Sequence, residues 1–160
     1  MIKPVLFIAA SALLLSSCGS GSETKVTSQE EKKVEVKSML EEEPKEADPM
    51  DNIGVGPATE VVFAEEVDME LAKKGEEVYT AKGCTACHKP DEKLLGPPPT
   101  GIYERRNPVW VMNMILNPEN MTKEDPIAKK LLQEYNGVQM TNQNLTQEEA
   151  RAVLEYFRTL

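Results

Sequence analysis

The sequence predicts an all-α domain of about four helices over residues 67–160, and three observations carry this prediction. Asn107-Pro108 and Asp125-Pro126 each join a helix-capping side chain to a proline suited to the first helical turn. Each pair precedes an apolar stretch whose spacing fits a helical repeat of 3.6 residues. No convincing strand pattern interrupts these segments.

The first helix is expected to begin near residue 67 and to end at Gly83. Val67, Leu71, Gly75 and Val78 fall on one face of this helix, and glycine suits the left-handed position that follows a helix C-terminus.

The second helix follows Asn107-Pro108 over "VWVMNMILN" and is expected to stop at Pro118. The third follows Asp125-Pro126 over "IAKKLLQEY" and ends at Asn136-Gly137. Its shared apolar face consists of Ile127, Leu131, Leu132 and Tyr135.

The last helix opens with Thr146 and Glu149, which have the spacing of a capping box. Its apolar stripe consists of Ala150, Val153, Leu154, Phe157 and Leu160. Four short helices with long loops leave a small domain with little apolar surface to bury, so we expect a large apolar group at its centre.

Residues 1–17 are predicted to be an export signal and not part of the fold. Lys3 precedes an apolar run of eleven residues, "VLFIAASALLL", which is too short to span a bilayer. The "LSSC" that ends at Cys18 resembles a bacterial lipobox, which implies acylation of Cys18 and a membrane anchor. The alternative is ordinary signal cleavage nearby, which would leave an exposed free thiol.

Residues 18–66 are expected to form an acidic, flexible tether. From residue 19 to 66 there are thirteen Asp and Glu but only five Lys, a net charge of −8. Such a composition buries too little apolar surface to offset the entropy of ordering. The whole chain carries −9, and this acidity argues against nucleic acid as a partner, because the phosphate backbone would repel it.

The segment "GCTACH" contains the chemistry-bearing motif of the domain. Cys84, Cys87 and the only histidine, His88, form C-x-x-C-H, the attachment signature of c-type haem. A zinc site needs further ligands, and no second cysteine pair exists. A thioredoxin-like dithiol is expected in a βαβ context, which a helical domain lacks. The motif therefore favours one covalent haem c.

At this point residues 67–160 resemble class I monohaem cytochrome c. "GEEVYTAKGCTACH" is similar to the first helix and haem motif of that family, and "GPPPTGIYER" is similar to its Gly-Pro-x-x-x-Gly-x-x-x-Arg segment. The resemblance implies a small cytochrome c fold. It also implies that Gly75 lets the first and last helices cross closely, with Tyr156 near the crossing.

The same resemblance implies roles for residues around the haem. The Pro97 carbonyl would accept a hydrogen bond from the His88 imidazole, and Arg105 would lie toward a haem propionate. Apart from the resemblance, Trp110, the only tryptophan, could donate its indole N–H to a propionate, and a buried packing role is the alternative.

Methionine is the natural sixth ligand to the iron, because His88 is the only histidine. The domain offers Met69, Met112, Met114, Met121 and Met140. Met140 lies in an irregular segment before the last helix, where the resembled family has its ligand. Met121, in the polar "NPENMTKEDP" segment, is the alternative.

These features together predict an electron carrier and not an enzyme. A His/Met-ligated haem would carry single electrons from a quinol-oxidising complex or another cytochrome to a terminal oxidase or reductase. The lipid anchor would hold it at a membrane of the cell envelope, facing the periplasm. The alternatives are a gas sensor or peroxidase-like enzyme with an open sixth site, and an accessory haem subunit of a larger complex.

Overall fold

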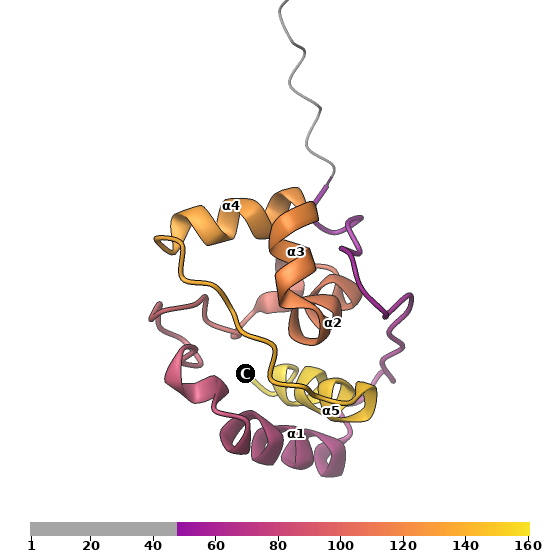
Figure 1. The fold of residues 1–160 in the computed structure, drawn as a ribbon. Coiled ribbons are helices and arrows are strands. Elements are labelled where there is room, and N and C mark those ends of the chain that lie inside the picture. Colours follow the sequence, from indigo (N-terminus) through magenta and orange to yellow (C-terminus); the bar gives the residue numbers. More distant parts are fainter. Residues whose placement is uncertain (1–47) are drawn as a thin grey trace, which may run out of the picture. The chain divides into compact units, whose positions relative to one another are not determined.

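The structure, a computed structural model, describes residues 48–160 and contains only helices as regular elements in that range. The predicted signal segment, Cys18 and residues 19–47 of the predicted tether lie outside the described residues. The α-helices are α1 (Met69–Ala81), α2 (Pro108–Leu116), α3 (Pro118–Glu124), α4 (Pro126–Glu134) and α5 (Gln147–Phe157), and Figure 1 shows their arrangement. Two short 3-10 turns, η1 (Cys84–Ala86) and η2 (Ile102–Glu104), interrupt the connection between α1 and α2. The prediction of an all-α fold is confirmed.

Helices α1 and α5 pack against each other (Figure 1), and Gly75 lies in their contact. A Cβ at Gly75 would overlap the Ala152 carbonyl group of α5. Around this crossing the Tyr79 ring lies 5.5 Å from the ring of Tyr156 and 5.7 Å from that of Phe157, measured between centroids. The close crossing expected at Gly75 is therefore present, with Tyr156 beside it.

Helix α3 was not predicted from the sequence. Pro118 ends α2, as expected, but it also occupies the first turn of a new helix, where its fixed φ and missing N–H are tolerated. The polar segment around Met121 is therefore helical, and the Met121 side chain is fully buried. The other helix starts agree with the sequence, including the reciprocal capping box of Thr146 and Glu149.

Residues 52–66, here called the strap, pack against the helices, which corrects the predicted domain boundary at residue 67. Asn113 of α2 binds the strap through three hydrogen bonds: Oδ1 accepts from the Ala58 N–H at 2.9 Å, and Nδ2 donates to the carbonyls of Ile53 and Ala58 at 2.9 and 3.0 Å. The Val55 N–H points to the Met121 sulfur at 3.0 Å. The tether prediction overlooked that side chains of α2 and α3 can order an acidic segment by binding its backbone.

The second half of the strap is held by two arginines of the α5 region. Arg151 donates to the Val62 carbonyl at 3.2 Å, and Arg158 donates to the carbonyls of residues 64, 65 and 66. Both guanidinium groups lie over the Phe63 ring, 4.7 and 4.9 Å from its centroid. Strap and α5 are thus joined by charged and aromatic contacts in addition to backbone hydrogen bonds.

Glu155 balances these arginines from within α5. Its side chain is 1% exposed and accepts hydrogen bonds of 2.6 Å from both Arg151 and Arg158, and one of 3.0 Å from the Asp68 N–H. Burial would raise the pKa of the Glu155 carboxyl, but these hydrogen bonds outweigh burial and lower that pKa below its ordinary value. The carboxylate therefore stays ionised inside the fold.

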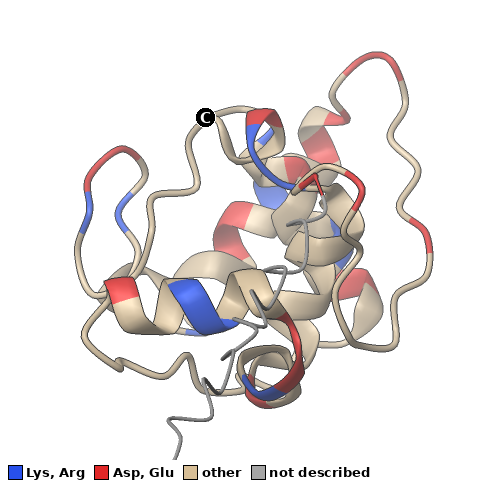
Figure 2. Cartoon of the chain, turned by 90° about the horizontal axis from the view of Figure 1, so that it is seen from above, with Lys and Arg blue, Asp and Glu red and all other residues tan. Residues whose placement is uncertain are grey.

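The charges of the described residues are unevenly distributed (Figure 2). Between residues 48 and 68 there are six Asp or Glu and no Lys or Arg. The basic residues lie elsewhere in the domain. Among the described residues, no helix is long and apolar enough to cross a membrane.

Candidate functional site

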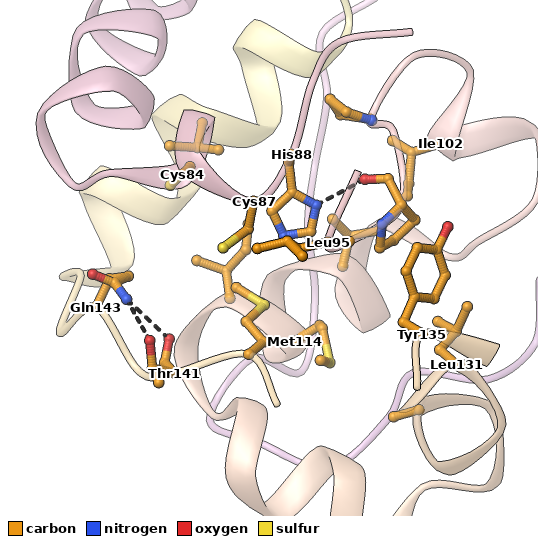
Figure 3. Close-up of a pocket in the computed structure, with 18 of the residues that line it drawn as sticks. Cys84, Cys87, His88, Leu95, Ile102, Met114, Leu131, Tyr135, Thr141 and Gln143 are labelled. Carbon is orange, nitrogen blue, oxygen red and sulfur yellow. Dashed lines mark hydrogen bonds between the residues drawn. The ribbon is translucent and has the colours of Figure 1, made fainter. Parts of the chain in front are cut away.

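The C-x-x-C-H motif follows directly on the end of α1. Gly83 adopts φ +75°, which ends the helix and directs the chain into the 3-10 turn η1. The amides of Cys87 and His88 both donate to the Cys84 carbonyl, at 3.1 and 2.9 Å. This tight turn brings both thiols and the imidazole to the wall of a single pocket (Figure 3). Both cysteines are half-buried.

The orientation of the His88 ring is fixed by its neighbours. Nδ1 lies 2.8 Å from the Pro97 carbonyl oxygen, as predicted, and the dashed line at His88 in Figure 3 marks this contact. Since a carbonyl can only accept, Nδ1 carries the proton and Nε2 is left with its lone pair for a metal. Gly96 packs against the ring so closely that a Cβ there would overlap the imidazole.

Tyr79 supports the motif from α1, a role that the sequence analysis did not identify. Its side chain is 3% exposed, and its hydroxyl donates to the His88 carbonyl at 2.9 Å. Burial raises the pKa of Tyr79, so the phenol stays protonated and remains a donor. The signal in the sequence was an aromatic residue nine positions before the only histidine.

The remaining pocket wall is largely apolar and comes from every part of the helical domain. Figure 3 shows Ile102, Leu131 and Tyr135 around the same space as His88. The other apolar lining side chains include Leu95, Pro99, Val111, Ile115, Leu132, Leu145, Val153 and Phe157. Arg105 and Arg106 are the ionised residues of this lining, so a ligand that fits it is apolar in its body and anionic at one end.

Arg105, which was expected to lie toward a haem propionate, is bonded to backbone carbonyls. Arg105 lines the pocket, and its guanidinium donates to the carbonyls of Thr100 at 2.8 Å and Pro98 at 2.6 Å. Arg105 therefore fixes the loop that carries Pro97. Its pairing with a propionate stays a prediction.

The proposed hydrogen bond from Trp110 to a propionate is not what the structure contains. The Trp110 indole N–H donates to the Asp125 carboxylate at 3.0 Å, and the same carboxylate caps α4 through the Ala128 N–H and accepts from Asn52. The Trp110 ring is buried and still lines the pocket. The packing alternative is therefore the better description of this residue.

The five methionines occupy different environments. Met69 is 66% exposed at the start of α1, and Met112 is buried in the core away from the pocket lining. Met121 is 0% exposed, and its sulfur accepts the Val55 N–H. Met114 of α2 and Met140 line the pocket, and both are half-buried. Only Met140 of these two lies outside a helix.

The pocket meets the requirements of haem c with its own residues. Cys84 and Cys87 stand where two thioether bonds can form, His88 offers Nε2, and the apolar walls with two arginines match a macrocycle that carries two carboxylates. A helical domain with this site defines a c-type haem protein. The chain belongs to the cytochrome c family, which matches residues 72–160. Its cofactor is accordingly a covalently bound haem c.

Solved structures of similar sequence come from one organism. The chain is 44% identical to a cytochrome c from Rhodothermus marinus, with a TM-score of 0.62, and the match covers 65% of this chain and 88% of that one. An engineered form of the Rhodothermus marinus cytochrome c is 43% identical, with a TM-score of 0.61 and coverages of 65% and 89%. The same engineered protein bound to a carbene intermediate gives 43% identity, a TM-score of 0.59 and coverages of 65% and 88%. A comparison with curated proteins finds no significant match.

Proposed function

We propose that this cytochrome is an electron carrier whose haem iron is ligated by His88 and Met140. The observation that carries the proposal is the His88–Pro97 contact, which directs Nε2 to the pocket, together with Met140 on the non-helical wall. With both axial positions filled, small molecules cannot bind to the iron without displacing a ligand. A thioether ligand favours ferrous iron, and apolar walls add to that preference, so the potential is expected to be high.

Met140 is preferred over the other methionines on structural grounds. The burial of Met121 and its contact with the strap argue against the alternative that the sequence left open. Met114 is the competitor that the structure adds, but its backbone is fixed in α2 between the core and α5. A loop residue can adjust to the length of an iron–sulfur bond more freely than a residue in a packed helix.

The ligand assignment is tested by a potentiometric titration of the visible spectrum of the haem-loaded protein. Met140→Ala is compared with Met114→Leu and Met121→Leu. Axial ligands change haem potentials over a range of about 0.8 V, so loss of the ligand is easily detected. We expect a lower potential and carbon monoxide binding for Met140→Ala alone. A parent protein that itself binds carbon monoxide would favour the sensor or enzyme alternative, and the same changes in Met114→Leu would transfer the role to Met114.

We further propose that the carrier is anchored to a membrane of the cell envelope through acylated Cys18 and works on the periplasmic side. The lipobox-like "LSSC" supports this. Anchoring raises the concentration of the cytochrome near membrane-bound partners, here a quinol-oxidising complex or another cytochrome as donor and a terminal oxidase or reductase as acceptor. Partners and anchor are testable together: Cys18→Ala should move the haem protein from the membrane fraction to the soluble fraction and slow reduction by membranes. Co-purification with a partner in detergent would instead favour an accessory subunit.

A further inference from the structure

Helix α3 contacts both the strap and the segment that carries Met140. Its consecutive residues Met121 and Thr122 face different surroundings, because successive helical side chains are about 100° apart. Met121 is in contact with the strap through the Val55 N–H, and Thr122 lines the pocket. The strap contacts therefore fix the helix from which Thr122 projects.

Thr122 binds the residue next to Met140. Its hydroxyl lies 2.9 Å from Gln139 Oε1, 3.0 Å from the Pro118 carbonyl and 3.1 Å from the Glu119 carbonyl. With a single proton it donates to one of these acceptors at a time, and the Gln139 oxygen is the nearest. Gln139 Nε2 in turn donates to the Met140 carbonyl at 3.0 Å. A chain of two hydrogen bonds thus runs from α3 to the backbone of Met140.

Few other hydrogen bonds hold the Met140 segment to the helices. The described hydrogen bonds from residues 139–145 to α2 and α3 are the one from Thr122 to Gln139 and a longer one, 3.3 Å, from Asn142 to the Leu116 carbonyl. The remaining side-chain bonds of this segment, such as those of Gln143 to Thr141, are local. Thr122 is 9% exposed, so its hydroxyl is largely shielded from water, while the Gln139 side chain that accepts from it is exposed.

We propose that Thr122 is a positioning residue for the sixth ligand: through Gln139 it holds the Met140 segment over the pocket and slows dissociation of the thioether. This inference rests on the proposed ligation by Met140. It predicts that loss of the Thr122 hydroxyl leaves Met140 able to bind the iron but makes it easier to displace.

The test uses the full-length, haem-loaded ferric protein and added imidazole, which binds the iron only when the sixth ligand has left. Thr122→Val removes the hydroxyl and keeps the branched shape, Thr122→Ser keeps the hydroxyl, and Gln139→Leu removes the other partner on the surface. Thr80→Val, on an exposed position of α1, is the matched control. Imidazole binding is followed by absorption, and the free energy of unfolding is measured for every variant.

We expect imidazole to bind about fivefold faster and more tightly to Thr122→Val and Gln139→Leu, the factor that corresponds to one ordinary hydrogen bond. The double variant should equal either single one, and Thr122→Ser and Thr80→Val should behave like the parent. Parent-like imidazole binding in both Gln139→Leu and Thr122→Val overturns the inference, even if Thr122→Val is less stable. Met140→Ala separates the two claims: if it binds imidazole as the parent does, the proposed ligation itself is wrong and the inference falls with it.

Discussion

Replacing Gly75 by alanine tests the close crossing of α1 and α5. In the middle of a helix this change alone would stabilise the protein by about 1 kcal/mol, because alanine has the higher helix propensity. Against this, the new Cβ would lie 2.5 Å from the Ala152 carbonyl carbon and 2.9 Å from the Val153 nitrogen. Ordinary contact begins at 3.4 Å, so clearing the carbonyl carbon alone requires a movement of 3.4 − 2.5, or 0.9 Å, and the carbonyl oxygen, which lies closer still, requires more.

A gap of this size removes about a quarter to a half of the dispersion energy of each contact across the interface. Ala72 and Tyr79 of α1 and Val153 of α5 are buried there. Overpacking of a core costs about 1–3 kcal/mol, and here the obstacle is backbone, which yields less than a side chain. We therefore expect a net loss of about 2 kcal/mol in the free energy of unfolding.

The assay is guanidinium chloride unfolding of the haem-loaded protein, followed by circular dichroism. Glu77→Ala, on an exposed position of the same helix, is the control and should change the free energy by less than about 0.5 kcal/mol. A Gly75→Ala protein as stable as the parent, or more stable by the propensity difference, would refute the reasoning.

Three further predictions concern the imidazole, the buried carboxylate and the strap. Gly96→Ala should displace the His88 ring, because its Cβ would overlap the imidazole; we expect a high-spin absorption spectrum, and an unchanged low-spin spectrum would contradict this. The pKa of Glu155 is lowered in the folded state, so its ionised form stabilises the fold at neutral pH and this contribution is lost as the pH falls below about 4.5. Glu155→Gln should therefore cost about 2 kcal/mol at pH 7 and weaken the loss of stability as the pH falls below about 4.5; parallel pH curves for variant and parent would rule this out. Asn113→Ala removes three hydrogen bonds to the strap, which should cost about 2–4 kcal/mol and open the chain near Ala58 to limited proteolysis; a strap as resistant as in the parent would show that other contacts suffice.

The helices, the haem motif and its carbonyl partner could be predicted because each rests on local signals or on a family pattern. Asn107-Pro108, Asp125-Pro126 and the Thr146 capping box act within a few residues of themselves, and the structure contains all three as helix starts. The same logic missed α3, because a proline that stops one helix is also suited to start the next.

The strap could not be predicted because its order depends on distant partners. Nothing in the acidic composition of residues 52–66 indicates that Asn113, more than 50 positions later, would bind their backbone. The hydrogen bond of Trp110 is a similar case. Its acceptor, Asp125, looked like a helix cap, and it performs that role while also accepting the indole N–H.

The strap makes the folded domain begin before the region that the family pattern matches. The family pattern begins at residue 72, yet the polar side chains of Asn113 and Asp125 are buried partly by residues 52–58. A protein shortened to residues 72–160, the part that the family pattern matches, would leave the Asn113 amide group without the three partners it has here and would uncover the Met121 side chain. The part of this chain that folds as a unit is thus larger than the part by which its family is recognised, and any transfer of the haem domain to another protein has to carry the strap with it.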